Sequence, residues 1–275
     1  MGMLIGHAPQ FDVVHEQLTV DEAVRYSVEL RSRSDWTSGQ IEERVTQAID
    51  DVALSDKRHD TVGSHSGAKT LSGGQRKRVN IAMELANEPK VLLLDEPSSG
   101  LSSHDTADLM RLIRRLADKG NTVILTIHQP SYSAFVLMDK ILVLEAGGFT
   151  AYYGPAAKDS FEYYGVTDRE PEALLEQMER KANREVEGKW AKHFAGSDTK
   201  RRFVDNPREA LDKNPMQPVA KPPPRSGAEV LSTLVKRSLG LKFRDPFFMV
   251  LCGVVPVVVS LIFAFVMNAG VEDLD

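Results

Sequence analysis

Two short stretches of the sequence carry residue types suited to phosphate chemistry. In the first, Ser72 precedes Gly73 and Gly74 at the start of a predicted helix, and Gln75 follows. Serine is a typical helix N-cap, because its oxygen can accept a hydrogen bond from a backbone N–H of the first turn. The glycines leave the next N–H groups uncovered, so an anion can approach the positive end of the helix. Taken alone, this pattern is typical of an anion site and also of an ordinary cap.

The second stretch is an apolar run, 91–94, that ends in two carboxylates, Asp95 and Glu96. Four consecutive apolar residues are typical of a strand buried on both faces of a parallel sheet. Pro97 cannot donate to a continuing ladder, so the strand is expected to end there. Carboxylates in this position can bind a metal or activate water, and they also occur where a strand simply meets solvent.

Alternating helices and strands must position these residues. A helix from about His104 to Asp118 and a strand from Thr122 to Ile127 follow the carboxylates, and His128 ends that strand. A strand at 141–144 turns through two glycines into a partner at 149–153. This alternation predicts a mainly parallel α/β sheet, with the 122–127 strand buried in it. A lone histidine at a strand end is by itself an ordinary structural residue.

The region before the first stretch predicts two amphipathic helices. Thr19 and Glu22 have the spacing of a capping box and start a helix that runs through Arg33. A second helix has a stripe of apolar residues expected to be buried: Ile41, Val45, Ala48, Ile49 and Val52. Residues 60–70 are rich in glycine, serine and histidine and are expected to form a loop.

The composition changes in the second half of the chain. Residues 170–187 predict a charged helix, and the polar, proline-containing stretch 188–225 is expected to be a linker. A basic amphipathic helix follows at 228–241. Residues 247–267 carry no charge and are long enough to span a membrane. Basic residues precede this run and acidic residues follow it, so the positive-inside rule places its N-terminal side in the cytoplasm.

Bulk composition excludes several classes of protein. The chain has 275 residues, enough for one domain with appendages. Its net charge of -5 shows no excess of basic residues that would bind nucleic acid. The single cysteine, Cys252, cannot form a disulfide framework or a cysteine metal site within the chain. Residues 1–10 lack the pattern of a signal peptide.

In their order, the two stretches resemble the signature motif and the Walker B motif of an ATP-binding cassette (ABC) ATPase. The continuation Arg76-Lys77-Arg78-Val79 is similar to the ABCG-type subfamily, bacterial relatives included. The resemblance implies a P-loop NTPase-type, mainly parallel sheet with a helical subdomain. It divides the chain into a truncated nucleotide-binding domain (1–165), a linker (166–225), an amphipathic juxtamembrane helix (226–245), a transmembrane helix (246–268) and the start of an extracytoplasmic loop (269–275).

The same resemblance implies ATP and Mg²⁺ as cofactors and assigns roles to the residues. Asp95 would hold Mg²⁺ through water, with Gln10, the Q-loop glutamine, sensing the metal and the attacking water. Glu96 would act as the general base, and His128 would be the switch histidine beside the γ-phosphate. The signature residues Ser72, Gly73, Gly74 and Gln75 would contact ATP held by the opposite subunit.

Two departures from the family pattern stand out. No Gly-x-x-x-x-Gly-Lys-[Ser/Thr] phosphate loop is present, and Gly67-Ala68-Lys69-Thr70 lacks the second glycine beside the lysine. The resemblance therefore covers the C-terminal two-thirds of a cassette, with the phosphate loop expected before Met1. In the D-loop, Ser102 stands where the family usually has aspartate, which puts the coupling of two sites in doubt.

These inferences predict the ATP-hydrolysing portion of an ABCG-like exporter in a membrane, with its nucleotide-binding domain in the cytoplasm. The expected partners are a second nucleotide-binding domain, a transmembrane domain and the lipid bilayer, and no nucleic acid is expected. Two alternatives remain: a non-catalytic subunit that lends its signature motif to another chain, and a soluble, non-transport ABC ATPase. Without the phosphate loop, the chain alone is expected to be inactive.

Overall fold

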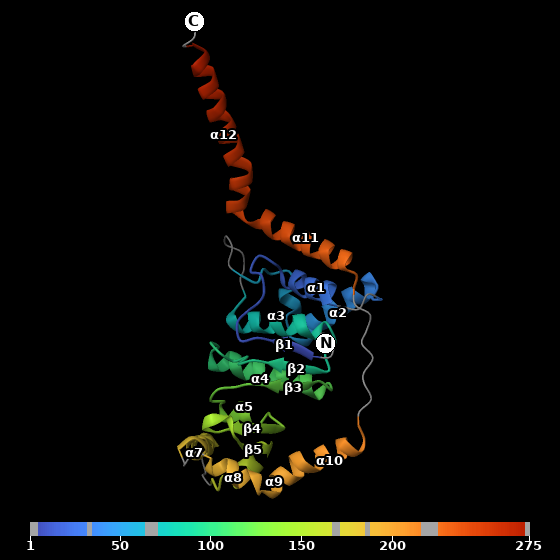
Figure 1. Ribbon diagram of the computed structural model, residues 1–275, viewed down its shortest axis with the longest axis vertical. Helices are drawn as coiled ribbons and strands as arrows, with labels where there is room; N and C mark the ends of the chain where they lie inside the picture. Colours follow the sequence, from blue (N-terminus) through green and yellow to red (C-terminus); the bar gives the residue numbers. More distant parts are fainter. Residues whose placement is uncertain are drawn as a thin grey trace. The chain divides into compact units, whose positions relative to one another are not determined.

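The computed structural model describes residues 5–31, 35–63, 71–166, 171–184, 188–215 and 225–272 (Figure 1). The chain forms two compact units. The first unit consists of Met1–Leu93 with Pro222–Asp275, and the second unit is Leu94–Lys221. Strands and helices are both present, with a parallel sheet and one long apolar helix near the C-terminus, so the predicted α/β class is confirmed.

The first unit begins with strand β1 (Ile5–Ala8) and helix α1 (Val20–Arg31). The predicted capping box is present: the Thr19 N–H donates to Glu22 Oε2 at 3.0 Å, and the Glu22 N–H donates to Thr19 Oγ1 at 3.2 Å. The two bonds of the capping box satisfy N–H donors that the first turn would otherwise leave unpaired. The expected end of this helix at Arg33 lies outside the described residues.

Helix α2 (Ser38–Asp51) packs against α1 and ends before a short 3-10 turn, Ser55–Lys57. Thr37 and Gln40 form a second capping box at its start. The predicted apolar stripe is buried throughout, with Val45 and Val52 fully inaccessible to solvent. A period near 3.6 residues therefore identified both the helix and its buried face. Residues 64–70, which make up most of the loop predicted at 60–70, lie outside the described part of the chain.

Helix α3 (Gly73–Leu85) and strand β2 (Val91–Leu94) carry the two chemical stretches. Leu92 and Leu94 are buried, whereas Val91 and Leu93 are only half-buried. The prediction of a strand buried on both faces was therefore wrong for this strand. Successive side chains alternate between the faces of a sheet, and one face of β2 is covered less fully than the other.

The strand order is β1-β2-β3, with β3 (Thr122–Leu125) at the edge of the described sheet. The prediction that this strand is buried was wrong: Ile124 is 56% exposed. An edge strand has a neighbour on one side only, so its side chains receive less cover. Helix α4 (Ser103–Asp118) precedes β3 and begins within a residue of its predicted start.

The second unit also contains the predicted hairpin. After the short helix α5 (Tyr132–Phe135), strand β4 (Lys140–Leu144) pairs antiparallel with β5 (Thr150–Pro155), from Lys140 opposite Pro155 to Leu144 opposite Thr150. Gly147 and Gly148 turn the chain with φ of 83° and 77°, which side chains with a Cβ rarely adopt.

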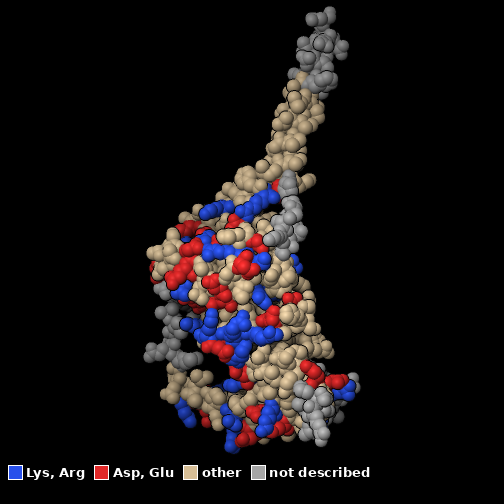
Figure 2. Space-filling view, turned by 180° about the vertical axis from the view of Figure 1, so that it is seen from behind, with Lys and Arg blue, Asp and Glu red and all other residues tan. Residues whose placement is uncertain are grey.

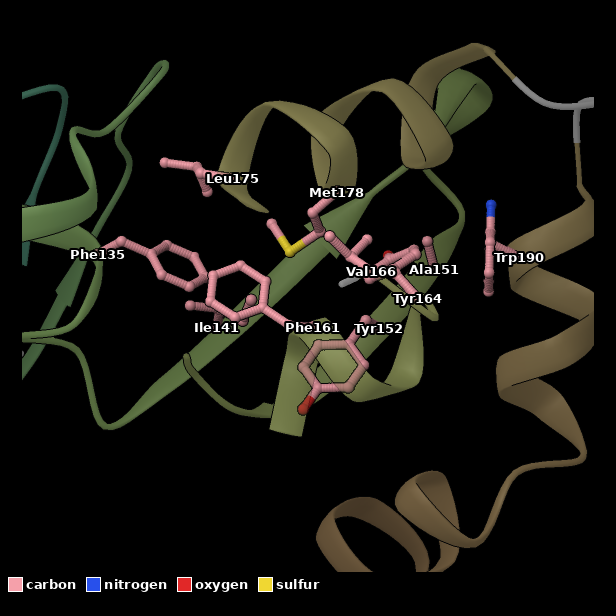
Figure 3. Close-up of a cluster of buried hydrophobic side chains, with 10 residues drawn as sticks. All are labelled: Phe135, Ile141, Ala151, Tyr152, Phe161, Tyr164, Val166, Leu175, Met178 and Trp190. Carbon is pink, nitrogen blue, oxygen red and sulfur yellow. The ribbon is translucent and has the colours of Figure 1, made fainter. Parts of the chain in front are cut away.

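Helices α6 (Lys158–Tyr163), α7 (Pro171–Arg184) and α8 (Lys189–Ala195) follow the hairpin. Figure 3 shows side chains from α5, the hairpin and these helices in one apolar cluster. In the cluster, Phe135 and Phe161 have ring centroids 5.6 Å apart, and Trp190 lies 4.6 Å from the ring of Tyr164. This aromatic packing gives the second unit its own core.

The stretch expected to be a linker is largely helical. Beyond α8 the chain forms α9 (Asp198–Lys200), a π-helical turn (Arg201–Asp205) and α10 (Asn206–Lys213). Trp190 and Phe194 lie four positions apart on α8, and both are buried. These two large apolar side chains lie on one face of α8 and anchor this segment. The polar composition of the segment concealed this pattern in the sequence.

Helix α11 (Gly227–Arg244) leads into helix α12 (Pro246–Glu272). The segment Phe247–Ala264 has a mean hydropathy of 2.7 and is 0% buried, so its length and composition suit a membrane span. Figure 2 shows the described part of α12 without charged side chains and Lys and Arg side chains close to its base. Helix α11, which precedes α12, carries the basic residues Lys236, Arg237, Lys242 and Arg244.

Candidate functional site

The carboxylates at the end of β2 are joined by a threonine from the end of β3. The Thr126 hydroxyl donates to Asp95 Oδ1 at 2.8 Å, and the Glu96 N–H donates to Thr126 Oγ1 at 2.9 Å. The Thr126 N–H in turn donates to Leu94 O at 3.0 Å. One hydroxyl therefore orients both the Asp95 side chain and the Glu96 backbone.

The backbone at this place is strained. Glu96 has φ of 40°, and Gln129, the residue after His128, has φ of 48°. A residue with a Cβ is held in such a conformation at a cost of about 1–3 kcal/mol, and only where its surroundings fix it. The Thr126 bond to the Glu96 N–H is one such restraint.

Sequence reasoning did not single out Thr126. The sequence feature that could have identified Thr126 is a hydroxyl-bearing residue at the end of a strand adjacent to the strand that carries the carboxylates. Carboxyl ends of parallel strands meet at one edge of a sheet, so residues just past those ends are candidates for a shared site. His128 lies two positions beyond Thr126 and is exposed.

The loop after the carboxylates leads to α4, which is capped by Ser102. Its hydroxyl accepts from the Asp105 N–H at 3.1 Å and lies 2.8 Å from Asp105 Oδ2. Gly100, two positions earlier, has φ of 74°. The serine in place of the usual aspartate therefore serves as an effective N-cap within this chain.

The first stretch forms the predicted capped helix start. Ser72 Oγ accepts from the Gln75 N–H at 3.3 Å, and the Ser72 N–H donates to Gln75 Oε1 at 2.9 Å. Ser72 itself is exposed, whereas Gly74 is buried. The geometry is a capping box on a helix whose positive end faces solvent at Ser72.

The segment that carries Gln10 is bound to the same helix. The Lys77 ammonium donates to the backbone oxygen of Gln10. Two residues further, Asp12 accepts from Asn80 Nδ2 at 2.7 Å, and Asp12 is paired with Arg76 at 3.4 Å and with Lys77 at 3.5 Å. Gln10 therefore lies in a segment held by the helix that begins at Ser72, a connection that the sequence analysis did not anticipate.

The two units divide the predicted site residues. Gln10, Ser72, Gly73, Gly74 and Gln75 belong to the first unit, and Asp95, Glu96 and His128 belong to the second. Within the second unit, the structure joins Asp95 and Glu96 through Thr126. Within the first unit, it joins the Gln10 segment to α3.

The residues present fit Mg²⁺ and ATP in part. Among the described residues no group of three His, Cys, Asp or Glu side chains could hold a metal ion. Mg²⁺ does not require such a group, since it keeps several waters and uses one or two carboxylates with substrate phosphates. Asp95 is an exposed carboxylate oriented by a neutral hydroxyl, which suits that role.

Charge near the start of α1 shifts two pKa values. Hydrogen bonds from the Arg244 guanidinium hold the pKa of Glu22 below its ordinary value. Burial, followed by the positive charge of Arg237, lowers the pKa of His15. Hydrogen bonds from Arg244 to Gln17 O and to the Glu22 carboxylate place the end of α11 beside the start of α1.

A cavity of about 280 Å³ lies in the same part of the first unit. Its lining includes Val13 and His15 from the segment after Gln10, Tyr26 and Ser27 from α1, and Arg237 from α11. Helices α1, α3 and α11 and the segment after Gln10 therefore border one opening.

Comparison with known proteins supports the cassette assignment. Residues 2–99 match the family described as ABC transporter. ABC transporter G family member 28 of Arabidopsis thaliana is 39% identical over 155 residues, which is 56% of this chain and 14% of the relative. ABC transporter G family member 26 of the same plant is 38% identical over 175 residues, 64% of this chain and 25% of the relative.

The third relative comes from Bos taurus. It is named Broad substrate specificity ATP-binding cassette transporter ABCG2 and is 39% identical over 161 residues, 58% of this chain and 24% of the relative. The chain therefore spans a quarter or less of the length of these three relatives.

Proposed function

We propose that this chain belongs to the ABCG type of ABC transporters and supplies the ATP-binding and ATP-hydrolysing part of an exporter. The observation that carries the proposal is the Thr126 bridge between Asp95 and Glu96. It orients two carboxylates with different tasks at the end of one strand. Hydrolysis in the assembled transporter drives substrate movement across the membrane.

In this proposal each residue has one task. Asp95 would hold Mg²⁺ through water. When it is bound, the metal would neutralise negative charge on the phosphates. Glu96 accepts a proton from the attacking water, and His128 contacts the γ-phosphate. Gln10 positions the same water and couples its binding to the transmembrane domain. Ser72, Gly73, Gly74 and Gln75 bind ATP held by a second nucleotide-binding domain, with which this chain pairs.

The membrane location of the proposed exporter is supported by α12. Its 18-residue apolar window is entirely exposed, which a soluble protein would tolerate poorly. In this proposal α12 crosses the bilayer and the nucleotide-binding residues lie in the cytoplasm. Membrane fractionation separates this proposal from a soluble ABC ATPase, because extraction into the aqueous phase without detergent contradicts it.

The second candidate is a subunit without hydrolytic activity of its own. Such a subunit would still present Ser72 and its helix to the ATP of a partner. Mg-ATP hydrolysis by the assembled transporter decides between the two: loss of activity in Glu96→Gln supports the catalytic proposal. Activity that depends on Ser72 but not on Glu96 supports the second candidate.

A further inference from the structure

The segment between β1 and α1 is attached to α3 by three side chains on one face of that helix. Arg76, Lys77 and Asn80 occupy neighbouring positions there, and all three contact Asp12. Residues separated by three or four positions share one face of a helix, so a single acidic side chain can contact them together.

The buried member of this group is Asn80, which is 3% exposed. Its amide nitrogen donates to Asp12 Oδ1 at 2.7 Å, and its amide oxygen accepts from the Val13 N–H at 3.4 Å. Both ends of a buried amide are therefore satisfied by the same short segment. Leaving either end of this buried amide unpaired would destabilise the folded state, so the segment and the helix are expected to keep this register.

The charged members connect Asp12 to the two predicted site elements. Lys77 contacts Asp12 and also donates to the backbone oxygen of Gln10. Arg76 contacts Asp12 and also donates to the backbone oxygen of Leu71 at 3.4 Å, immediately before Ser72. A continuous set of polar contacts thus runs from Gln10 through Asp12 to the start of the signature helix.

We propose that Asp12 is a positioning residue that makes the Gln10 segment and the signature helix move as one element. Gln10 acts at the ATP site of its own subunit, whereas Ser72 acts on the ATP of the partner subunit. Asp12 thereby transmits the state of one ATP site to the other. This role rests on the proposed function, while the mechanical link itself can be measured without nucleotide.

The test measures whether a disturbance at Ser72 reaches Val13. Ser72→Ala removes the N-cap and loosens the first turn of α3 by about 1 kcal/mol, which is expected to speed amide exchange at Gln75 and Arg76 about fivefold. Hydrogen–deuterium exchange of the 275-residue chain in detergent micelles reads these amides and that of Val13 together. With Asp12 intact, Val13 exchange should rise at least threefold.

The same disturbance is then applied to chains that also carry Asp12→Asn. Asparagine keeps the shape and can still accept from Asn80, but it loses the attraction to Arg76 and Lys77. Exchange at Gln75 and Arg76 should still rise, whereas Val13 should no longer respond. The matched control is Asp56→Asn, which removes a carboxylate that is 76% exposed and leaves the response intact.

A Val13 response that persists in the Asp12→Asn background overturns the proposal. If that variant does not fold, Lys77→Met decides, because it removes the contacts to Asp12 and Gln10 while keeping the aliphatic stem. A second arm uses the assembled transporter, in which Asp12→Asn should raise the KM for ATP at least threefold and change kcat less than twofold. If Asp12 only stabilised the fold, kcat would fall in proportion to the fraction of folded protein and KM would be unchanged. An inactive wild-type transporter would refute the proposed function and leave the exchange result standing.

Discussion

Arg244, the last residue of α11, donates to both carboxylate oxygens of Glu22 in α1, at 2.6 and 2.7 Å across 222 residues of sequence. The same guanidinium donates to the backbone oxygen of Gln17 at 3.1 Å. Glu22 also closes the capping box with Thr19. One carboxylate thus joins the start of α1 to the helix that leads into α12.

Glu22→Gln should separate these two roles, because glutamine can complete a capping box but cannot form an ion pair. The pair is partly exposed, so solvent screening limits its contribution to about 1 kcal/mol or less. Because Arg244 lowers the pKa of folded Glu22, this stabilisation exists above the unfolded pKa and is lost as pH falls through the folded value. Thermal unfolding should show the variant less stable at pH 7 and equal to wild type at strongly acidic pH. An equal difference at both pH values would contradict the assignment.

Glu96→Gln should lower Mg-ATP hydrolysis by about 10² to 10⁴ in the assembled transporter, because glutamine cannot take the proton of the attacking water. ATP binding should be unchanged. Asp95→Asn should differ by weakening both Mg-ATP affinity and turnover, since it removes the proposed metal ligand. Steady-state hydrolysis and nucleotide titration on the same preparations separate the two. If Glu96→Gln kept more than about a tenth of the wild-type rate, Glu96 would not be the base.

Thr126→Val should lower hydrolysis about tenfold or more, because the site loses one hydrogen bond to a carboxylate and one to the Glu96 N–H. Valine keeps the branched shape, so packing is preserved. Thr126→Ser retains the hydroxyl and is the matched control, with a rate expected near that of wild type. Equal rates for the valine and serine variants would show that the bridge has no catalytic importance.

The 275-residue chain by itself should bind Mg-ATP weakly, because its sequence lacks the lysine and backbone cradle of a phosphate loop. Calorimetric titration of the purified chain is the measurement, and no saturation is expected at micromolar ATP. A dissociation constant in the micromolar range would contradict this prediction and would point to another phosphate-binding element.

A reporter fused after Asp275 should respond as extracytoplasmic, because basic residues precede the apolar run and acidic residues follow it. A reporter inserted at Ser226, before α11, should respond as cytoplasmic and serves as the control. A cytoplasmic response after Asp275 would refute the predicted span or its orientation.

The sequence alone was sufficient where the determining interactions are local. The capping box at Thr19, the N-cap at Ser72 and the start of α4 depend on contacts within about one turn of helix, and the apolar period of α2 marks its buried face, so residue spacing predicts them. The resemblance to the ABCG type of ABC transporters likewise came from two short motifs, and two relatives of that type are 39% identical over more than half of this chain.

Tertiary structure decided the features that join residues distant in sequence. Thr126 bridges carboxylates about thirty positions away, and Asp12 meets Asn80 across 68 positions. The exposure of β3 depends on its place at the edge of the described sheet, and α8 packs Trp190 into an aromatic core built from other elements. No local spacing encodes these outcomes, because each requires the backbone to bring a distant partner within hydrogen-bonding or packing distance.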